Sequence, residues 1–367
     1  MSTTAKAAVA YDKNGTVVIE DVVLDSLRPN ELLIEIEACG ICHTDEKFRQ
    51  RLPLPAVFGH EGVGSVLEIG DRVKNASVGD RVILSYPYCT NCSPCRRNEP
   101  YRCERIPALK FGGGRLDGTS AVTLDGRSIT SGFFQQSSFA TKAVVVEQTV
   151  VPVADEYRDI TSSVLAAMPC GVQTGAGAVM NTFAGRPNEG IAVMGAGAVG
   201  ISAVMAAKTI GMNPIICADL HPERLALAGE LGATHIVDVG KESLMDIVKL
   251  AAPKGVHYAL DSSATVAGLE ASIEAIGQGG KVGIVSYPND GDAFPFNTKT
   301  LFLKVASIHA IVQGFSVPQT FLPKLLELHK KGSFPVERLV STYEFSDINR
   351  ALEDAHSGAA IKPVLLM

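Results

Sequence analysis

Several features that mark other classes of protein are scarce in this sequence. It has no tryptophan, and only 6% of its 367 residues are aromatic, so composition alone gives little guide to a ligand. Charge of one sign is also lacking, because 33 Lys and Arg residues stand against 39 Asp and Glu residues, a net charge of −6. Such a chain has no overall electrostatic attraction to nucleic acid or anionic lipid. Neither is expected as its main partner.

Long hydrophobic runs are missing as well. No stretch reaches the roughly 18 unbroken apolar residues that a membrane span needs, and the segment from Met1 to Gly15 lacks the apolar core of a signal peptide. Hydrophobic residues still make up 46% of the chain and charged residues 20%, which is typical of soluble globular proteins. The sequence predicts a cytoplasmic protein that is long enough for two domains and is not a small disulfide-stapled scaffold.

The hydrophobic pattern changes along the chain. The N-terminal part has short strand-like segments separated by turn residues, and apolar residues alternate with glutamates in Ile34–Ala38, which favours half-exposed antiparallel sheet. From about Gly190, apolar runs alternate with helical segments, a pattern typical of βαβ units. The tail from Val317 returns to amphipathic helices and a last strand. The predicted fold class is α/β, with a doubly wound parallel Rossmann sheet and a second, β-rich domain.

A glycine-rich motif, GAGAVG at residues 195–200, follows a predicted strand and opens a predicted helix. In this context Gly195 permits the tight turn, Gly197 lets the backbone approach a pyrophosphate, and Gly200 lets helix and strand pack closely. Asp219 ends the next predicted strand, where a carboxylate would accept hydrogen bonds from the adenosine ribose and repel a 2′-phosphate. The motif predicts NAD(H) binding. A helix-capping role for Asp219, before His221, is the alternative.

Four cysteines lie close together in the sequence, with the spacing C-x2-C-x2-C-x7-C. They are Cys89, Cys92, Cys95 and Cys103. Four thiolates can close a tetrahedral shell around Zn²⁺ and leave no open coordination position, which predicts a structural zinc site. An iron–sulfur cluster is the rival, but its bacterial motif places the fourth cysteine sooner and before proline. A zinc-ribbon module for nucleic acid is a weaker alternative, because few basic residues flank the motif.

A second possible metal site is dispersed over the chain. Cys42, His60 and Cys170 could supply two thiolates and one imidazole, which would leave a fourth position open, as in a catalytic zinc site. Taken singly, His60 is as compatible with a structural histidine and Cys170 with a buried thiol. The spacing alone does not decide between these interpretations.

The motifs together resemble a known family. GICHTD, GHEGVG, VGDRV, the four-cysteine loop, CGVQTGAG and GAGAVG occur in the order found in the zinc-dependent medium-chain alcohol dehydrogenases. The stretches FFQQSSFAT and CGVQTGAGAV are most similar to the aryl-alcohol (benzyl alcohol) dehydrogenase branch. The resemblance implies a GroES-like catalytic domain at residues 1–168, completed by 312–367 and carrying both zinc sites, and a dinucleotide-binding Rossmann domain at 169–311.

The resemblance also implies a role for individual residues. Cys42, His60 and Cys170 would bind the catalytic zinc, with Glu61 beside it as an alternative ligand, and Asp45 would orient His60. Thr44 would take the substrate proton. The implied coenzyme contacts, besides the glycine motif and Asp219, are His43, Thr174 and Lys362, and the implied pocket residues are Ser85, Phe133, Phe134 and Ile311. Lys47 stands where many relatives carry the last histidine of a proton relay.

The expected activity is the interconversion of a hydrophobic, aromatic or allylic primary alcohol and its aldehyde, with NAD as the hydride carrier and two zinc ions per chain. A homodimer or homotetramer is implied. A polyol dehydrogenase of the same superfamily is the alternative within the enzyme class, and it should line its pocket with polar groups. A non-catalytic binding protein is the alternative from another class, and it should have lost a ligand; none of the expected ligands is missing from the sequence.

Overall fold

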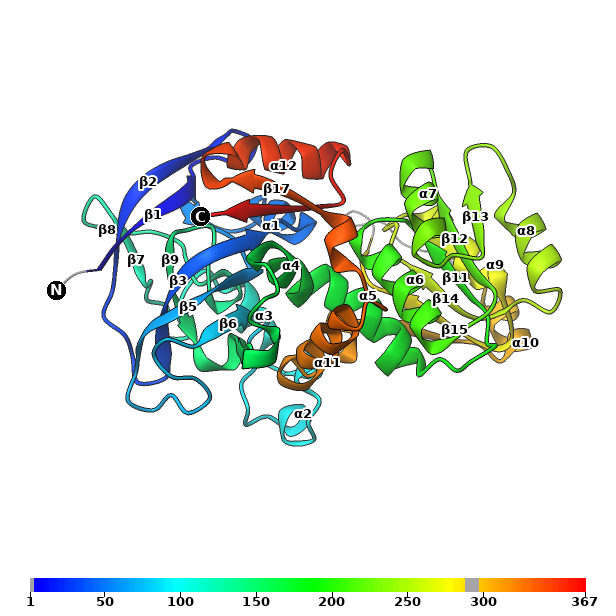
Figure 1. Ribbon diagram of the computed structural model, residues 1–367, viewed down its shortest axis with the longest axis horizontal. Coiled ribbons are helices and arrows are strands. Elements are labelled where there is room, and N and C mark those ends of the chain that lie inside the picture. Colours follow the sequence, from blue (N-terminus) through cyan, green and yellow to red (C-terminus); the bar gives the residue numbers. More distant parts are fainter. Residues whose placement is uncertain (1–2, 288–296) are drawn as a thin grey trace. The chain divides into compact units, whose positions relative to one another are not determined.

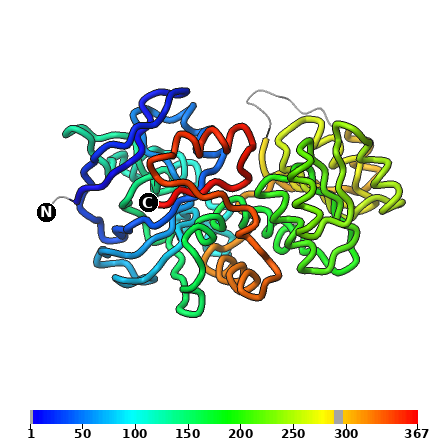
Figure 2. The backbone as a smooth tube through the Cα atoms, turned by 45° about the horizontal axis from the view of Figure 1, so that its top comes forward, coloured from blue at the N-terminus to red at the C-terminus, as the bar shows by residue number. Residues whose placement is uncertain are grey.

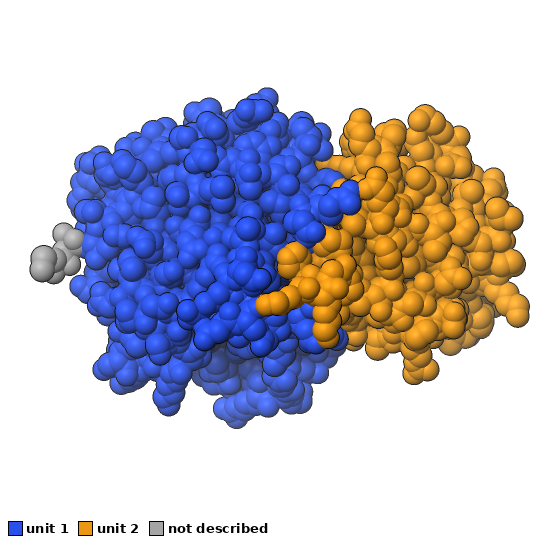
Figure 3. Space-filling view, in the orientation of Figure 1, with its two compact units in different colours: residues 1–170, 317–327, 336–367 blue, residues 171–316, 328–335 orange. Residues whose placement is uncertain are grey.

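The computed structural model describes residues 3–287 and 297–367, which form two compact units (Figure 1, Figure 3). Unit 1 comprises Met1–Cys170, Val317–Glu327 and Val336–Met367, and unit 2 comprises Gly171–Ser316 and Leu328–Pro335. Unit 1 is therefore built from both ends of the chain, with unit 2 inserted between them.

Unit 1 contains two largely antiparallel sheets. The first has the order β4-β1-β2-β7-β8, with β1 Thr3–Ala10, β2 Val17–Leu24, β4 Ala56–Val57, β7 Val122–Leu124 and β8 Arg127–Ser128. The second has the order β10-β6-β5-β3-β18-β17, with β9 also pairing with β3. Its strands are β3 Glu31–Gly40, β5 Gly62–Ile69, β6 Arg81–Leu84, β9 Lys142–Val146, β10 Val150–Pro152, β17 Val340–Glu344 and β18 Lys362–Leu366. The sequence-based prediction of a β-rich domain is confirmed.

Strand β18 joins the two ends of the chain within unit 1. It pairs antiparallel with β3, Val364 opposite Gly40, and parallel with β17. Figure 2 shows the red C-terminal end of the chain lying among the blue and cyan N-terminal segments. All but the last residue of β18 are buried, as expected for an interior strand. The pairing brings Lys362 next to the segment that leads into helix α1 (His43–Arg49).

The other α-helices that lie wholly or mainly in unit 1 are short, apart from two near the C-terminal end. They are α2 Ser93–Arg96, α3 Ile106–Phe111, α4 Ser162–Ala167, α11 Pro318–Lys330 and α12 Ile348–Ser357. Helix α11 contains Pro323, which lies in its second turn and still leaves the helix continuous. Strand β17, between α11 and α12, was not predicted from the sequence.

Unit 2 is a parallel six-stranded sheet of order β13-β12-β11-β14-β15-β16. Strands and helices alternate along the chain: β11 Ile191–Met194, α6 Ala198–Ile210, β12 Ile215–Asp219, α7 Pro222–Leu231, β13 His235–Asp238, α8 Leu244–Ala251, β14 Val256–Asp261, α9 Val266–Ala275, β15 Ile276–Ile284, α10 Thr298–Lys304 and β16 Ser307–Ala310. Numbered within the unit, this is the 3-2-1-4-5-6 order of a Rossmann fold. The predicted doubly wound sheet is confirmed.

One boundary in unit 2 differs from the sequence-based expectation. In the sequence, Val266–Gly277 has helical spacing of its apolar residues and the next apolar run begins at Lys281, but β15 begins at Ile276. A Cβ on Gly277 would collide with the carbonyl oxygen of Lys254. The glycine is needed for close approach of two backbones, and its low strand propensity hid the strand.

One helical stretch, Ser162–Phe183, contains the junction between the units, and by length and composition it is apolar enough to cross a membrane. Of its apolar segment, however, 83% is buried inside the protein, as in a core helix. Its turn at Met168–Val172 is a π-helix, and helix α5 (Gln173–Gly177) follows. Single π-helical turns frequently occur at functional sites, and this one carries Cys170.

Candidate functional site

Four side chains of unit 1 converge in a group that could hold a metal ion. They are Cys42, His60, Glu61 and Cys170, and their donor atoms all lie within 4.8 Å of one another. Cys42 caps the N-terminus of α1, His60 and Glu61 precede β5, and Cys170 lies in the π-helical turn. The two sulfur atoms are 4.0 Å apart. Two thiols and one imidazole are a donor set suited to zinc.

Asp45 fixes the orientation of His60. Its Oδ1 lies 2.9 Å from His60 Nδ1 and accepts the N–H of Gly59 at 3.0 Å, while its Oδ2 accepts the N–H of Cys42 at 3.0 Å. Because the carboxylate is an acceptor, Nδ1 donates its proton to Asp45, and Nε2 is the nitrogen left to bind a metal ion. Among the described residues Nε2 has no hydrogen-bond partner, although it is buried. A buried, unpartnered nitrogen that faces two thiols fits a metal ligand.

The charges around this group favour a thiolate. The hydrogen bond with Cys170 lowers the pKa of the Cys42 thiol well below its usual range, against the effect of burial. Burial alone would lower the pKa of His60, but Asp45 and Cys42 together raise it to about 10. A metal ion bound at Nε2 would replace the proton that this raised pKa favours there.

Glu61 is held by a buried lysine. Lys362 donates to Glu61 Oε2 and, at 3.2 Å, to the carbonyl oxygen of Ile41. A Cβ on Gly40 would collide with the Glu61 carboxylate and with the backbone carbonyl oxygen of Ala166, so glycine is required there. Burial raises the pKa of Glu61 and the ammonium group opposes this effect. Lys362, expected from the resemblance to contact a pyrophosphate, here has 2% of its surface exposed and contacts Glu61.

Other expected residues of helix α1 lie near the donor group. The hydroxyl of Thr44 is 3.6 Å from Cys42 Sγ, which places it beside the metal-binding donors. His43 is exposed at the first position of α1, and Lys47 is partly buried one turn later. Thr44 is therefore in contact with a proposed ligand.

The expected pocket residues of unit 1 are closely packed. The Phe134 ring stacks on the His60 imidazole, with centroids 4.3 Å apart, and Phe133 meets His60 edge-on at 5.5 Å. Ser85 donates to the carbonyl oxygen of Pro169 at 3.1 Å. All three side chains are buried. In unit 1 these residues support the donor group directly.

Sequence reasoning missed two buried polar residues in this region. Gln136 hydrogen-bonds to the backbone on both sides of Glu61. Lys110, on α3, has its ammonium over the rings of Tyr86 and Phe134, 4.6 and 5.1 Å from their centroids. Burial lowers the pKa of Lys110 to about 8, although the charges of nearby thiolates oppose the shift. No local motif marks either residue, because each acts across long sequence separations.

The four clustered cysteines form a second group in unit 1. Cys89, Cys92, Cys95 and Cys103 bring their sulfur atoms within 4.8 Å of one another, and Cys89 and Cys95 are 3.9 Å apart. Backbone N–H groups of Cys89 and Cys92 point at sulfur atoms of the set, at 3.3 and 3.4 Å. Such N–H groups stabilise thiolates. Four thiolates can enclose one zinc ion completely.

The glycine motif of unit 2 has the expected geometry. Gly195 has a φ of +95°, which favours glycine, and a Cβ on Gly200 would collide with the carbonyl oxygen of Gly195. A Cβ on Gly197 would meet nothing within 4 Å. The loop therefore leaves open space beside the Gly197 backbone, at the N-terminus of α6, where a pyrophosphate fits.

Asp219 is tied to this loop. Its Oδ2 accepts the N–H of Ala196 at 2.6 Å, and its Oδ1 accepts the backbone N–H of His221 and lies 2.8 Å from the His221 ring. Burial would raise the pKa of Asp219, but these hydrogen bonds lower it. The N-cap of α7 is His221 itself, so Asp219 does not cap that helix. Ser262, which the sequence did not indicate, donates to the carbonyl oxygens of Met194 and Gly195 and supports the same turn.

The remaining expected residues lie in the interior of unit 2. Thr174, on α5, has 8% of its surface exposed and Ile311 has 3%. A Cβ on Gly283 would touch Ile311, which places Ile311 against β15.

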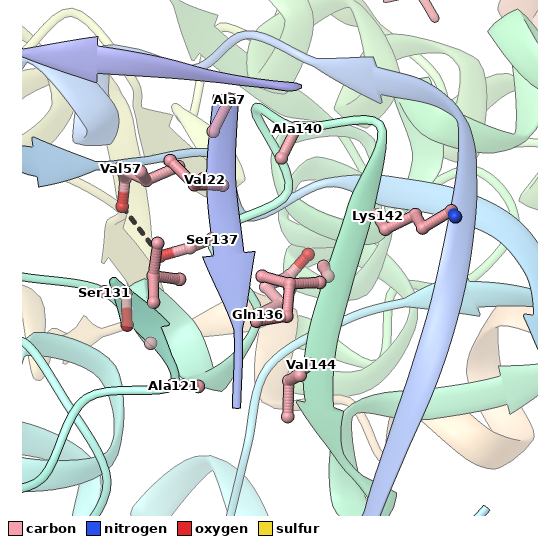
Figure 4. A pocket seen from close by; sticks show the side chains of 14 residues that line it. Ala7, Val22, Val57, Ala121, Ser131, Gln136, Ser137, Ala140, Lys142 and Val144 are labelled. Atoms are coloured by element: carbon pink, nitrogen blue, oxygen red, sulfur yellow. Dashed lines mark hydrogen bonds between the residues drawn. The ribbon is translucent and has the colours of Figure 1, made fainter. Parts of the chain in front are cut away.

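A small cavity in unit 1 is separate from the donor group. It has a volume of about 20 Å³ and is lined mainly by apolar side chains of β1, β2, β7 and β9 (Figure 4). Ser137 and Gln136 also line it, and Ser137 donates to the carbonyl oxygen of Val57 at 2.7 Å. The volume suits about one water molecule and no organic substrate.

Comparison with known proteins agrees with the fold and the donor group. Residues 28–155 match the alcohol dehydrogenase GroES-like domain, and residues 198–330 match the zinc-binding dehydrogenase domain. The fold and the site thus define a zinc-dependent alcohol dehydrogenase of the medium-chain type.

Three individual proteins are similar to this chain over nearly its whole length. The chain is 37% identical over 366 residues to a geraniol dehydrogenase of Castellaniella defragrans, covering 99% of this chain and 97% of the relative. An alcohol dehydrogenase zinc-binding domain protein of Burkholderia ambifaria has a TM-score of 0.97 and 40% identity over the whole of both chains. Benzyl alcohol dehydrogenase of Acinetobacter calcoaceticus has a TM-score of 0.95 and 35% identity, over 100% of this chain and 99% of that one. The chain belongs to the zinc-dependent medium-chain alcohol dehydrogenases and is an alcohol oxidoreductase.

Proposed function

We propose that this enzyme interconverts hydrophobic primary alcohols, aromatic or allylic, and their aldehydes, with NAD as the hydride carrier. The observation that carries the proposal is the donor group of Cys42, His60 and Cys170, in which a buried imidazole nitrogen lacks a partner among the described residues. Bound zinc would act there as a Lewis acid that lowers the pKa of an alcohol.

The chain's own residues then have distinct tasks in the reaction. Asp45 holds the His60 tautomer that presents Nε2. The Thr44 hydroxyl, beside Cys42, accepts the proton of the substrate hydroxyl and passes it outward. Glu61, paired with Lys362, is the alternative ligand. The βαβ unit holds the nicotinamide so that distance and orientation control hydride transfer.

The coenzyme part of the proposal is NAD(H), not NADP(H). Its support is Asp219, whose partly buried carboxylate lies next to the glycine motif and would repel a 2′-phosphate. We assign His43 and Thr174 as further coenzyme contacts. We assign Lys362 as well, and its ammonium group would then exchange Glu61, its partner in this structure, for a pyrophosphate. In this assignment residues 169–311 are the coenzyme domain, and residues 1–168 with 312–367 are the catalytic domain.

The metal part of the proposal is two zinc ions per chain. The first is catalytic, at Cys42, His60 and Cys170. The second is structural, because Cys89, Cys92, Cys95 and Cys103 can supply four thiolates and no open position.

The substrate class rests on the relatives and on the apolar surroundings of the donor group. Geraniol and benzyl alcohol, named in two relatives, are primary alcohols whose hydroxyl-bearing carbon adjoins an unsaturated carbon. Phe133 and Phe134 pack beside His60, and Ser85, the one polar residue among the expected pocket residues, is buried. Together with Ile311, they are the proposed pocket residues.

Steady-state rates on a panel of alcohols and aldehydes, each with NAD and NADP, test this function. Benzyl alcohol and geraniol should be oxidised with far higher kcat/KM than sorbitol. A preference for sorbitol would establish the polyol dehydrogenase alternative. Absence of turnover by zinc-loaded protein with every alcohol would favour the non-catalytic alternative.

We also propose a homo-oligomer, a dimer or tetramer, in the cytoplasm. Helix α10 and the residue after it expose Phe302, Leu303 and Val305, by 82, 60 and 69%, and β16 is an edge strand of the parallel sheet. Exposed apolar side chains beside a strand edge with which no described residue pairs suit association with a second copy. Sedimentation velocity of the full chain should give a mass above that of the 38.7 kDa monomer.

A further inference from the structure

A short segment of unit 1, Gly132–Ser138, has an unusual backbone. Phe134, Gln135 and Ser137 all have positive φ angles, of 52, 55 and 49°, as does Gly132 at 70°. For residues other than glycine the left-handed region is uncommon, and each such residue is strained. Three of them within four positions require strong compensating contacts.

The compensating contacts of the aromatic residues converge on His60. The ring of Phe134 lies nearly parallel to the imidazole, with an interplanar angle of 23° and a centroid distance of 4.3 Å. The ring of Phe133 meets the imidazole at 85°. The imidazole is thus confined on one face and at one edge, and its rotation about χ2 is blocked by packing.

The contacts of Gln136 fix the backbone that carries the same histidine. Its Nε2 donates to the carbonyl oxygens of His60 at 3.0 Å and Ser85 at 2.9 Å. Its Oε1 accepts the N–H of Gly62 at 3.2 Å and the hydroxyl of Ser138 at 3.0 Å. The side-chain amide, 1% exposed, therefore uses two donors and two acceptors.

We propose that Gln136 and Phe134 are positioning residues for the metal ligand His60. Gln136 fixes the backbone on both sides of Glu61, and Phe134 fixes the plane of the imidazole. The proposal rests on the assignment of His60 as a ligand. It assigns Phe134 a task at the metal site in addition to any contact with substrate.

The physical basis is preorganisation. Asp45 determines which nitrogen of His60 carries the proton, but one hydrogen bond at Nδ1 leaves the ring free to swing about that contact. If the imidazole rotates, its Nε2 lone pair no longer points at the metal ion, so the metal ion dissociates faster. Gln136 restricts this motion by holding the His60 backbone, and Phe134 restricts it by packing on the face of the ring.

The adjacent residue Gln135 offers a matched control. It is also a buried glutamine, 5% exposed, but its amide donates to the carbonyl oxygens of Leu109 and Gly114, at 3.2 and 2.9 Å. Gln136→Met and Gln135→Met therefore remove similar buried amides from consecutive positions. Only the first change releases the His60 backbone.

The test compares metal release from full-length, zinc-loaded protein, with no alcohol or coenzyme present. A chromogenic chelator follows the fast-releasing zinc, and cobalt substitution at that site gives an absorption spectrum that reports ligand geometry. Gln136→Met should speed release about 10- to 100-fold and alter the cobalt spectrum. Gln135→Met should leave the release rate within about threefold of that of the parent protein and the cobalt spectrum unchanged. This should hold even if it lowers Tm as much as Gln136→Met does.

Phe134→Leu is the second variant, because it keeps the apolar volume and removes the stacked ring. It should also speed release and shift the cobalt spectrum. Equal release from all variants, or equal acceleration by Gln135→Met and Gln136→Met, would overturn the proposal. Since no substrate is involved, this result is independent of whether the parent protein oxidises any alcohol.

Discussion

One carboxylate, that of Asp45, hydrogen-bonds to both His60 Nδ1 and the backbone N–H of Cys42, at 2.9 and 3.0 Å. An amide cannot replace it, because Asn has a single acceptor oxygen and its NH₂ group would face one of these N–H donors. We expect Asp45→Asn to weaken zinc binding at the catalytic site about 10- to 100-fold.

Competition with a chelator of known affinity measures this change. Glu46→Gln is the control, since Glu46 is the next residue of α1, is exposed, and contacts His356 instead of a proposed ligand. Similar affinities in all three proteins would show that Asp45 does not support the ligand.

The two cysteine groups should respond differently to substitution. Cys170→Ala removes a ligand from a group with an open position, and should abolish activity while the protein stays folded and keeps about one zinc per chain. Cys95→Ala opens a closed four-thiolate shell, and should lower Tm or yield. Elemental analysis and thermal unfolding distinguish the outcomes. A parent protein with one zinc per chain, or with the visible absorption of an iron–sulfur cluster, would contradict the assignment.

Asp219 should govern the choice between the two coenzymes. Removing its carboxylate in Asp219→Ala eliminates repulsion of a 2′-phosphate, and also the hydrogen bond from Ala196 that shapes the glycine loop. The ratio of kcat/KM for NAD to that for NADP should fall at least tenfold. Asp238→Ala, at the end of the neighbouring strand β13, should leave the ratio unchanged. A parent enzyme that prefers NADP would refute this role.

Proton exit should depend on Thr44 much more than on Lys47. Thr44→Ala removes the hydroxyl beside Cys42 and should lower kcat/KM by roughly 10²- to 10⁴-fold. An ammonium has no lone pair to accept a proton, so Lys47→Ala should cost less than about tenfold, and Lys47→His should mainly shift the pH profile. The pH profile of kcat/KM on one good alcohol tests all three. Equal losses in the two alanine variants would make Lys47 a working member of the relay.

Lys110 should make stability depend on pH. Burial lowers its pKa from 10.5 to about 8 in the folded protein. Between pH 8 and pH 10.5 Lys110 is more protonated in the unfolded chain than in the folded protein, so the free energy of unfolding rises with pH. Below pH 8 the buried lysine is charged, and its burial then destabilises the folded protein most. Lys110→Met should therefore stabilise the protein at pH 7, by at most about 3 kcal/mol, and the gain should fade toward pH 10.

Denaturant unfolding at several pH values checks this prediction. Lys249→Met, which replaces an exposed lysine of α8, is the control and should show no such trend. A gain that does not change between pH 7 and pH 10 would mean that the charge of Lys110 is not the cause.

Sequence patterns predicted those parts of the molecule that depend on local spacing. The glycine motif, the four-cysteine loop and the alternation of strands and helices in unit 2 all have short-range signatures. The chemistry of Cys42, His60 and Cys170 suggested a donor group, but only the resemblance favoured it over structural roles, because its members are far apart in the chain. Lys362 and Glu61, 301 residues apart, meet through strand pairing that no periodicity encodes. Gln136 was missed for the same reason, since its partners are backbone groups of distant loops.

The interior position of β18 has a consequence for the order in which the protein folds during synthesis. The six strands of unit 2, residues 191–310, are all made before β18, whereas the Ala38–Gly40 edge of β3 has to wait for residues 364–366. Domains usually fold as units from the N-terminus as they emerge from the ribosome. Here the inserted unit can finish first, while the N-terminal unit keeps an unpaired strand edge. Until Lys362 arrives, Glu61 also lacks its cation, so completion of the sheet and neutralisation of the buried carboxylate happen in one late step.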